Sequence, residues 1–358
     1  MRKIIKIFSI ATAAFVLLHC SDNKVRETSK NILASPSITK SHFANLQQTE
    51  HKIGKIKSFD VIDSTNLVVS SVNPASIIIY NFEGKPIRTI GRTGKGPFEY
   101  LSPSIVKSFK SRLYVWCDQS LKLIIFDVEG NPIEEVKGLT SAIKSFEIVD
   151  DNIFFFNHGN HKYIISIFNL SSRKNIINLG SGSEEHKLLS LAPCAGGITT
   201  MNDTIYFITA DDLTVCGINK KDFKLEKWKV EDKSFKVKPT KSNAEFTINE
   251  NREAAVEYLL ENPRITGLMH YHNRLLVKLE MGKYVKKEGR IDFTERFIYY
   301  CLINHKKGTI QSYSCRIDSD LMLEYPCLLS THKGNVYTIE PVQHKSDIEY
   351  ALYKLDFN

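Results

Sequence analysis

A glycine-rich stretch near residue 95 carries the strongest candidates for ligand binding. It brings Arg92, Lys95, Glu99 and Tyr100 close together in the chain. Their cationic, acidic and aromatic groups could hold an anionic or a sugar ligand. In the structural alternative, the glycines shape a turn, a proline fixes it, and Arg92 pairs with Glu99. We favour the structural alternative and keep the four residues as candidates.

The same stretch, Gly91-Arg-Thr-Gly-Lys-Gly-Pro97, has a superficial likeness to a phosphate-binding loop. No Ser or Thr follows its lysine, and neither flank continues as a helix. We therefore predict no nucleotide site and no cofactor. The sequence also contains neither a Gly-x-Ser-x-Gly nor a His-Glu-x-x-His motif, so it offers no familiar hydrolase signature.

Four further polar residues stand in gaps between apolar runs: Asp118, His158, His161 and Asp211. His158 and His161 could bind a metal together with Asp211 or Asp212, because His and Asp are common ligands. A His-x-x-His spacing on a loop is a weak signal, and solvated loop polarity explains it better. We predict no metal site and keep the four as candidates for ligand binding.

A repeated phrase shows which elements position these residues. The stretch Ile77-Ile-Ile-Tyr-Asn-Phe-Glu-Gly-Lys-Pro-Ile-Arg-Thr-Ile90 returns as Leu123-Ile-Ile-Phe-Asp-Val-Glu-Gly-Asn-Pro-Ile-Glu-Glu-Val136. Each copy indicates a strand, a tight turn with Glu-Gly, and a second strand opened by Pro. A hairpin that recurs every 40–50 residues or so is typical of a propeller blade.

The pattern can be followed through six units, whose first strands begin at Leu67, Leu113, Ile153, Ile205, Leu275 and Val336. These runs are rich in Ile, Val, Phe and Tyr, as buried strands are. The chain is thus predicted to form an all-β, six-bladed β-propeller. Because the last strand ends close to Asn358, a strand from within His42–Phe59 must close the ring and remove the free sheet edges.

One segment, 243–262, breaks the strand pattern. Its apolar residues Ala254, Val256, Leu259 and Leu260 are spaced for one face of a helix. Asn262-Pro263 ends it. We predict a short helical insertion between blades four and five, which either caps a blade or plugs the channel, or else acts as a lid or docking helix.

Propeller geometry relates the candidate residues to one another. The loop from one blade to the next lies on the same face as the loop between the second and third strands. Segment 91–104 should therefore share a face with the loops that carry Asp118, His158 and Asp211. Ligands of propellers usually bind over the channel mouth, so we expect a site on that face.

The first residues of the chain are predicted to form a targeting segment rather than part of the fold. Arg2, Lys3 and Lys6 precede a short apolar run that ends at Leu18-His19-Cys20. This resembles the lipobox of bacterial lipoproteins, in which the Cys carries a diacylglycerol; an ordinary secretory signal is the alternative. The resemblance implies a signal peptide at 1–19 and lipidation of Cys20. The polar composition that follows predicts a flexible tether at 20–40, and the repeated units place the propeller at 41–358.

Residues 21–24 resemble the signals that send some lipoproteins to the outer face of the outer membrane. We therefore expect an exported protein, held at the cell outer membrane by its lipid. The formal net charge of +8 is a mild excess without a long basic run. Solvated lysines explain it, and we predict no nucleic-acid partner.

Six cysteines remain beside Cys20, and all are far apart in the chain: Cys117, Cys194, Cys216, Cys301, Cys315 and Cys327. Their even number in an exported protein permits disulfides. Several stand in apolar strands, where a free thiol behaves as a small hydrophobe. We expect mostly buried free thiols, with at most one bridge among the last three.

The segment Gly91-Arg-Thr-Gly-Lys-Gly-Pro-Phe-Glu-Tyr100 resembles a Gly-Arg-x-Gly-x-Gly-Pro-x-Glu-Phe segment of the TolB-like six-bladed β-propeller lipoproteins. Tyr100 stands where that family usually has Phe. The resemblance covers about residues 41–358 and implies the fold, with little about activity.

We therefore predict a lipid-anchored binding or scaffold module of the cell envelope, for a protein or a small molecule such as a glycan. The alternative is a propeller enzyme of the lyase or lactonase type. Such an enzyme should place several His, Asp or Glu at the same blade position around the ring. The sequence offers His158, His161 and Asp211, from only two blades.

Overall fold

The computed structural model describes residues 38–48, 53–139, 143–232, 235–240, 243–287, 290–317, 328–344 and 347–358. The chain divides into two compact units, Met1–Leu33 and Ala34–Asn358, and every described residue belongs to the second. The predicted signal peptide, Cys20 and most of the predicted tether lie outside the described residues. Their assignments stay predictions.

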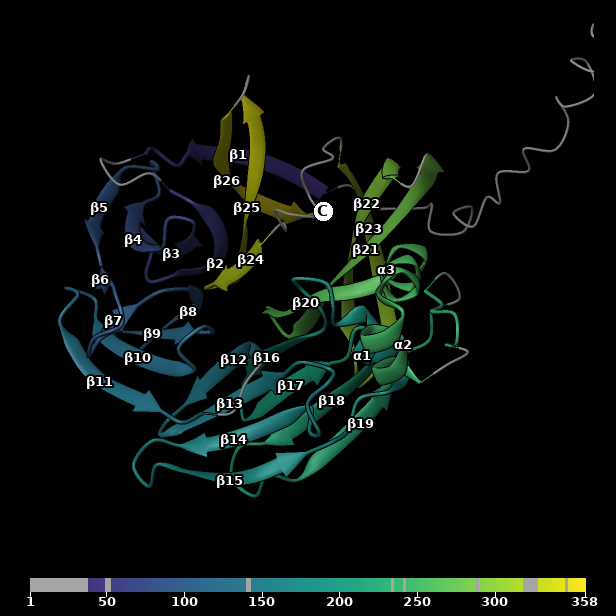
Figure 1. The fold of residues 1–358 in the computed structure, drawn as a ribbon, viewed down its shortest axis with the longest axis horizontal. Coiled ribbons are helices and arrows are strands. Elements are labelled where there is room, and N and C mark those ends of the chain that lie inside the picture. Colours follow the sequence, from purple (N-terminus) through teal and green to yellow (C-terminus); the bar gives the residue numbers. More distant parts are fainter. Residues whose placement is uncertain are drawn as a thin grey trace, which may run out of the picture. The chain divides into compact units, whose positions relative to one another are not determined.

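Six four-stranded antiparallel sheets stand around a common axis in the second unit, as the blades of a propeller do (Figure 1). The first three blades are β2 (Lys55–Val61), β3 (Asn66–Val72), β4 (Ser76–Asn81) and β5 (Pro86–Thr89); β8 (Pro103–Phe109), β9 (Arg112–Cys117), β10 (Lys122–Asp127) and β11 (Pro132–Lys137); and β12 (Ile143–Val149), β13 (Asn152–Asn157), β14 (Ile165–Asn169) and β15 (Lys174–Leu179). The fourth and fifth are β16 (Gly197–Met201), β17 (Thr204–Ile208), β18 (Thr214–Asn219) and β19 (Leu225–Lys229); and β20 (Arg264–Tyr271), β21 (Arg274–Lys287), β22 (Arg290–Asn304) and β23 (Thr309–Ile317). The predicted all-β, six-bladed fold is confirmed.

The sixth blade closes the ring by joining both ends of the described chain. It contains β24 (Leu328–His332), β25 (Asn335–His344) and β26 (Asp347–Phe357), and its outermost strand is β1 (Ile38–Asn45). β1 pairs antiparallel with β26 from Ile38 opposite Phe357 to Asn45 opposite Ala351. The closing strand therefore begins before the predicted window of 42–59. The end of that window, from Lys55, instead belongs to β2, the innermost strand of the first blade.

The repeated phrase forms the outer hairpin of the first two blades, as predicted. In each copy the register shifts by one residue beside the aromatic, so that Tyr80 lies opposite Pro86 and Phe126 opposite Pro132. Glycines with positive φ complete the turns, at 77° for Gly84 and 94° for Gly130. Only glycine adopts this conformation without strain, which explains the shared Glu-Gly.

Every predicted unit begins at the second strand of its blade, so the innermost strands were not predicted. The innermost strands pack against one another in sequence order, and β24 contacts β2 to complete the circle. The polar stretches between the apolar runs of the last two units also form strands, because β21 pairs with β22 as far as Lys287 opposite Arg290. β25 and β26 likewise pair as far as His344 opposite Asp347.

The predicted helical insertion is present but divided. It forms α2 (Ala244–Glu250) and α3 (Arg252–Glu261). The side chain of Asn251 accepts a hydrogen bond from the Ala254 backbone at 3.1 Å, which starts a second helix. The buried residues of α3 are Ala255 and Leu260. Of the four apolar residues predicted for one helix face, Leu260 is buried, and Ala254, Val256 and Leu259 are half-buried.

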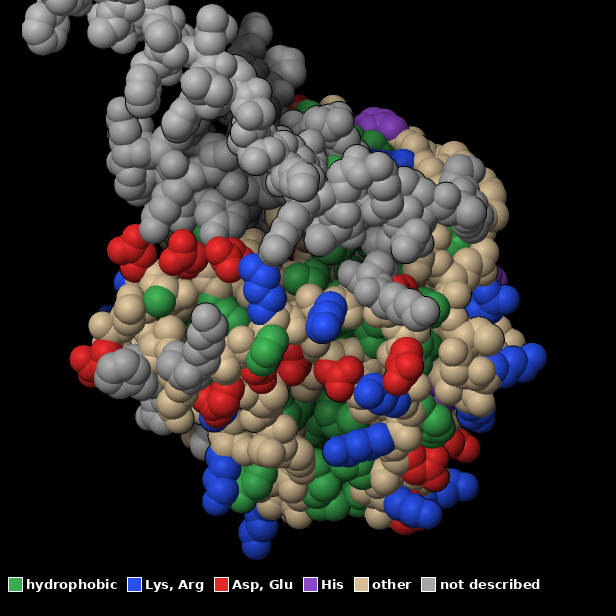
Figure 2. All heavy atoms as spheres, turned by 90° about the vertical axis from the view of Figure 1, so that its right-hand side faces the viewer, with side chains coloured by type: hydrophobic (Ala, Val, Ile, Leu, Met, Phe, Trp, Pro, Cys, Tyr) green, Lys and Arg blue, Asp and Glu red, His purple; other side chains and the backbone are tan. Residues whose placement is uncertain are grey.

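A third helix, α1 (Glu184–Leu189), was not predicted and lies between the third and fourth blades. Leu188 of α1 packs against Ala244 and Ala255, which joins the three helices into one small apolar cluster. In the described part of the chain, no helix is long and apolar enough to cross a membrane. Figure 2 shows basic and acidic side chains mixed over the side of the molecule that faces the viewer.

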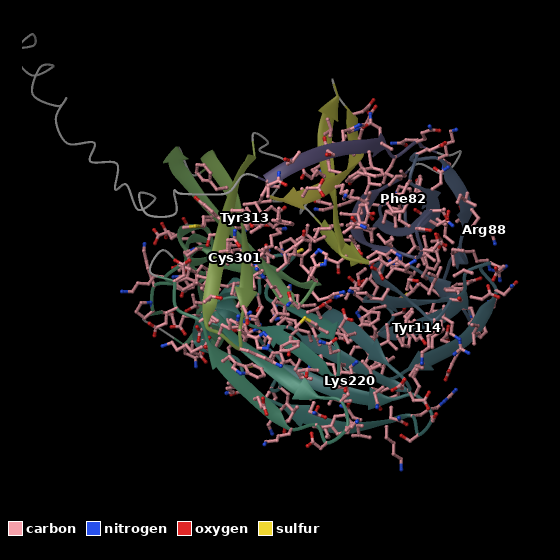
Figure 3. All side chains as sticks on the ribbon, turned by 180° about the vertical axis from the view of Figure 1, so that it is seen from behind. Phe82, Arg88, Tyr114, Lys220, Cys301 and Tyr313 are labelled. Atoms are coloured by element: carbon pink, nitrogen blue, oxygen red, sulfur yellow. The ribbon has the colours of Figure 1, made fainter. Side chains whose placement is uncertain are left out.

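The hydrophobic core consists of layers between adjacent blades, which side chains fill (Figure 3). Between the second and third blades, for example, Trp116 and Phe155 approach with ring centroids 6.1 Å apart. Cys117 and Cys301 are buried free thiols, and Cys194 and Cys216 are half-buried free thiols, as expected. Cys327 and the side chain of Cys315 lie outside the described part, so a bridge there stays a prediction.

Candidate functional site

The strand order gives the propeller two different faces. The turns from first to second and from third to fourth strand lie on one face, which we call the hairpin face. The loops from second to third strand, and from each blade to the next, lie on the opposite face, which we call the crossover face. All three helices stand in connections between blades, and therefore on the crossover face.

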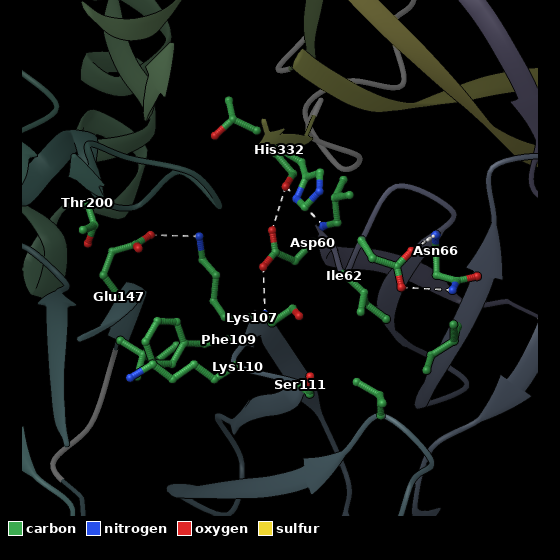
Figure 4. Close-up of a pocket in the computed structure, with 18 of the residues that line it drawn as sticks. Asp60, Ile62, Asn66, Lys107, Phe109, Lys110, Ser111, Glu147, Thr200 and His332 are labelled. Carbon is green, nitrogen blue, oxygen red and sulfur yellow. Dashed lines mark hydrogen bonds and ion pairs between the residues drawn. The ribbon is translucent and has the colours of Figure 1, made fainter. Parts of the chain in front are cut away.

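The innermost strands place polar residues at equivalent positions near the hairpin face. These residues are Asp60, Lys107, Glu147, Thr199 and Ser330. Asp60 stands one residue before the last paired residue of its strand, and the other four stand two residues before theirs. Together they line a cavity of about 590 Å³ (Figure 4). The cavity also reaches outward to Ile87 and Arg88 of β5 and to Val128 beyond β10. It is therefore elongated, from the ring centre toward the first two blades.

The charged groups of this hairpin-face cavity are largely paired with one another. Lys107 forms an ion pair of 3.1 Å with Glu147. Asp60 accepts hydrogen bonds from the Ser330 hydroxyl at 2.7 Å and from the Ser108 backbone at 2.8 Å. Burial lowers the pKa of Lys107, but the attraction of Glu147 and Asp60 outweighs it, and the pKa is raised. The lysine therefore stays protonated at neutral pH.

Two polar atoms in the cavity wall are buried and lack a partner among the described residues. They are the Nε2 atom of His332 and the hydroxyl oxygen of Thr200. Burial lowers the pKa of His332 and also that of His270, which lines the same cavity. Both imidazoles are therefore neutral at pH 7, and a neutral imidazole has one nitrogen that can accept a hydrogen bond. A ligand with hydroxyl groups could satisfy these atoms.

A second cavity, of about 360 Å³, opens toward the crossover face. It is shaped by a β-bulge that recurs in four of the six innermost strands, where one residue has no partner in the next strand. The bulged residues are Lys57, Ser104, Lys144 and Thr266. All four line the cavity, which is the effect expected of a bulge that re-aims a side chain.

Asp118 and His158, two of the residues selected from the sequence, also line this crossover-face cavity. Asp118 is exposed at the rim. Burial lowers the pKa of His158 to about 4, with a further contribution from the positive charge of Lys144 and from His186. The His158 ring is therefore neutral at pH 7. Its Nδ1 accepts a hydrogen bond of 3.2 Å from the Asn160 backbone.

The glycine-rich stretch forms a separate cluster that lines neither of these two cavities. Arg92 pairs with Glu99 at 2.7 Å, and the Gly96 backbone donates to Glu99 at the same distance. The buried Tyr100 hydroxyl donates to the Ile90 carbonyl at 2.8 Å, while Lys95 is exposed. A Cβ atom added at Gly94 would lie 2.0 Å from the Glu99 carboxylate. These contacts agree with the structural alternative.

Two buried charged residues of the second blade bind the backbone of the same stretch. Lys122 donates to the Gly96 carbonyl at 3.2 Å and pairs with Glu135 at 2.8 Å. Glu135 in turn accepts from the Phe98 backbone at 2.7 Å. Burial raises the pKa of Glu135, but hydrogen bonds from Lys122, Lys137 and Phe98 outweigh it and hold the pKa at about 2. The stretch is thus clamped at two points.

The structure separates the remaining two candidates from the cavities. Asp211 accepts a hydrogen bond of 2.6 Å from Ser183, which begins α1, and burial raises the pKa of its carboxyl group. The Nδ1 atom of His161 lies 3.2 Å from the Tyr163 backbone nitrogen, within its own turn. Neither residue lines the two channel cavities. Over the described ranges, no three His, Cys, Asp or Glu side chains are arranged to hold a metal.

The sequence contained a signal for cavity-lining residues that were not among the predicted site residues. The phrase Ile56-Lys-Ser-Phe-Asp60 returns as Ile143-Lys-Ser-Phe-Glu147. In both copies the lysine is the bulged residue, and the acid lines the hairpin-face cavity. Because the copies alternate polar and apolar residues only after the bulge, they do not follow a simple strand period.

Residues 23–274, more than two thirds of the chain, match the DUF5128 family, described as "6-bladed beta-propeller". The chain belongs to this family. The six-bladed fold implied by the resemblance to TolB-like lipoproteins is thus confirmed, while TolB-like membership itself stays a prediction. A search of the curated proteins found no match.

Solved structures share the fold with this DUF5128 chain. An exported protein of Bacteroides fragilis is 12% identical with a TM-score of 0.61, and the match covers 90% of this chain and 95% of that one. A member of the DUF4221 family from Bacteroides vulgatus is 12% identical with a TM-score of 0.60, over 90% and 98% of the two chains. The protein U3-55K is 9% identical with a TM-score of 0.51, over 89% and 99%.

Proposed function

We propose that this protein is an exported, lipid-anchored propeller that binds an uncharged, hydroxyl-rich ligand of the sugar class. The ligand lies in the hairpin-face cavity. The unpartnered polar atoms of Thr200 and His332 in its wall carry this proposal. A buried polar group without a partner costs free energy, and a ligand hydroxyl would remove that cost.

Charge and shape of the cavity support an uncharged ligand. Lys107 is neutralised by Glu147, and Asp60 is held by two donors, so these groups leave little net charge to attract an ion. Phe109, Ile62 and Met269 add apolar surface to the polar ring. Such a mixture of apolar walls and a few placed polar groups is typical of small-molecule sites.

The test compares two threonines that have the same buried, unpartnered hydroxyl group but lie at different positions in the fold. Thr200→Val removes a hydroxyl that lines the cavity, and Thr338→Val removes one that is equally buried and unpartnered but does not line it. The full-length protein in detergent is screened on a glycan array, and the dissociation constant of the best sugar is measured. Thr200→Val should weaken binding about threefold to tenfold, as loss of one hydrogen bond does. Thr338→Val should not change it.

Equal binding by wild type and Thr200→Val would contradict the proposed site. Binding of no sugar would contradict the proposed ligand class. In that case crosslinking of the full-length protein in native membranes would test the scaffold role, in which an envelope protein is the partner.

Lipid anchoring and export form the second part of the proposal. The apolar run that ends at Cys20 supports it, as does the fold shared with an exported protein of Bacteroides fragilis. Acyl chains add about 0.8 kcal/mol of membrane affinity for each buried CH₂ group. Cys20→Ala should therefore move the protein from the membrane to the soluble fraction. Continued membrane association of this variant would contradict the lipid anchor.

An enzyme is the second candidate function, because the hairpin-face cavity is lined by acid–base groups that lie far apart in the sequence. The carboxylates of Asp60 and Glu147 and the imidazoles of His270 and His332 come from four different blades and line one cavity. A lyase or a lactonase needs such groups. If any bound sugar is converted, Glu147→Gln should abolish turnover; unchanged turnover in this variant would exclude this cavity as the catalytic site.

A further inference from the structure

We infer that the crossover-face cavity is a second site, which binds the carboxylate or phosphate group of a small anion between Lys57 and Lys144. This site is distinct from the proposed sugar site, although the two cavities share the wall residues Lys107, Ile198, Leu268 and Met269. They therefore meet in the middle of the channel. The inference stands whether or not the hairpin-face cavity binds a sugar.

The first argument is geometric. Lys57 and Lys144 occupy the same bulged position in the first and third blades, within the repeated phrase Ile-Lys-Ser-Phe. A regular strand would have placed alternate side chains toward the neighbouring blade instead. The bulge directs both lysines into a cavity of about 360 Å³. That volume suits a small anion rather than a polymer.

The second argument is the charge balance of the cavity. The Lys144 ammonium donates to the Ala192 carbonyl at 2.8 Å, and among the described residues neither Lys57 nor Lys144 has a carboxylate partner. The nearby carboxylate of Glu280 is already shared by Arg264 at 2.8 Å and Lys278 at 3.2 Å. Asp118 is exposed at the rim. Two ammonium groups thus line the cavity, and neither is paired with a carboxylate of the described chain.

The third argument is a set of neutral donors around the two lysines. Thr266, at the bulged position of the fifth blade, is buried, and its hydroxyl lacks a partner within the described ranges. Ser104, at the bulged position of the second blade, and the neutral ring of His158 complete the lining. Ammonium and hydroxyl groups that converge in a cavity provide the charge-assisted hydrogen bonds that an oxyanion requires.

Several titratable groups face Lys144 from the neighbouring elements. They are Lys57 on β2, His158 after β13, and Cys194 before β16, with Lys278 and Glu280 on β21 beside Cys194. Burial, with the repulsion of Lys57, lowers the pKa of Lys144 to about 8, although Cys194 acts in the opposite direction. A bound anion should raise this pKa again. Binding at pH 8–9 should therefore take up protons.

The experiment uses the full-length protein in detergent, titrated calorimetrically with inorganic phosphate and, separately, with succinate, in chloride buffers. The two probes distinguish a preference for phosphate from one for carboxylate. Lys57→Met and Lys144→Met should each weaken binding about tenfold or more, since each removes a charge-assisted bond. Lys162→Met, an exposed lysine outside the cavity, serves as the matched control and should not change binding.

A second measurement keeps the inference testable if a variant fails to fold. In wild type at pH 8.5, the binding enthalpy should differ between buffers of low and high ionisation enthalpy, by the amount that proton uptake requires. Absence of binding for both anions at millimolar concentration would overturn the inference. So would binding that both lysine variants retain, or binding without any proton uptake.

Discussion

Thr200 and Thr338 show what an unpartnered hydroxyl does to the folded state. Both hydroxyl oxygens are buried and lack a partner in the described chain. Burying such a group costs free energy that a methyl group does not. Thr200→Val and Thr338→Val should therefore each raise the free energy of unfolding, by about 0.5–2 kcal/mol, in urea titrations of the ligand-free protein. A loss of stability in Thr200→Val would mean that its hydroxyl is satisfied in the folded protein.

Lys144 should make stability depend on pH in the alkaline range. Its pKa is about 8 in the folded protein against an ordinary value of 10.5. The unfolded state then binds more protons between these values, so the free energy of unfolding should rise from pH 8 to 10.5. Lys144→Met removes the buried charge and should stabilise the protein at pH 7 by about 1–3 kcal/mol. A variant with the same alkaline rise as wild type would contradict this account.

Single elements differ in how far the sequence predicts them. The outer hairpins are predictable because their turns use local chemistry, with Gly84 and Gly130 in a conformation that glycine favours. The innermost strands are harder, since a bulge at Lys57 and Lys144 breaks the alternation and charged residues face the channel. The end of α2 was missed because the cap at Asn251 lies within a continuous helical pattern.

The candidate site could not be assembled from the sequence for a related reason. The glycine-rich stretch attracts attention because its residues are adjacent in the chain, yet they pair mainly with one another. The hairpin-face cavity is lined by single residues, such as Asp60, Glu147 and Ser330, from blades far apart in the chain. Only closure of the ring brings them together.

The buried pair Lys122–Glu135 tests how the glycine-rich stretch is held. Removing one partner leaves a buried charge, so Glu135→Gln should lower the free energy of unfolding at pH 7 by about 3–5 kcal/mol. The double variant Glu135→Gln, Lys122→Met should recover much of that loss. Because the pKa of Glu135 is lowered to about 2, its contribution is present above about pH 4.5 and lost as pH falls toward 2. If the free energy of unfolding fell between pH 4.5 and 2 by the same amount in Glu135→Gln as in wild type, the stabilising role of Glu135 would be contradicted.

For the whole molecule, closure by β1 links the first and last parts of the described chain. Leu46 follows β1 and is buried in a cluster that joins the first and sixth blades. Leu46→Ala should lower the free energy of unfolding by about 2–5 kcal/mol and speed hydrogen exchange in β26. Ile176→Ala, at an exposed position of the third blade, is the control and should change stability by less than about 0.5 kcal/mol. Equal exchange in β26 would argue against closure by β1.

The most direct test of the central claim compares the two places where a ligand could lie. It measures the dissociation constant of the best array sugar for wild type, Thr200→Val and Arg92→Ala, in the full-length protein. We predict that Thr200→Val weakens binding about threefold to tenfold, while Arg92→Ala, which removes an exposed side chain of the glycine-rich stretch, leaves it within about twofold. The opposite result would place the ligand at the glycine-rich stretch and contradict a site at the hairpin face.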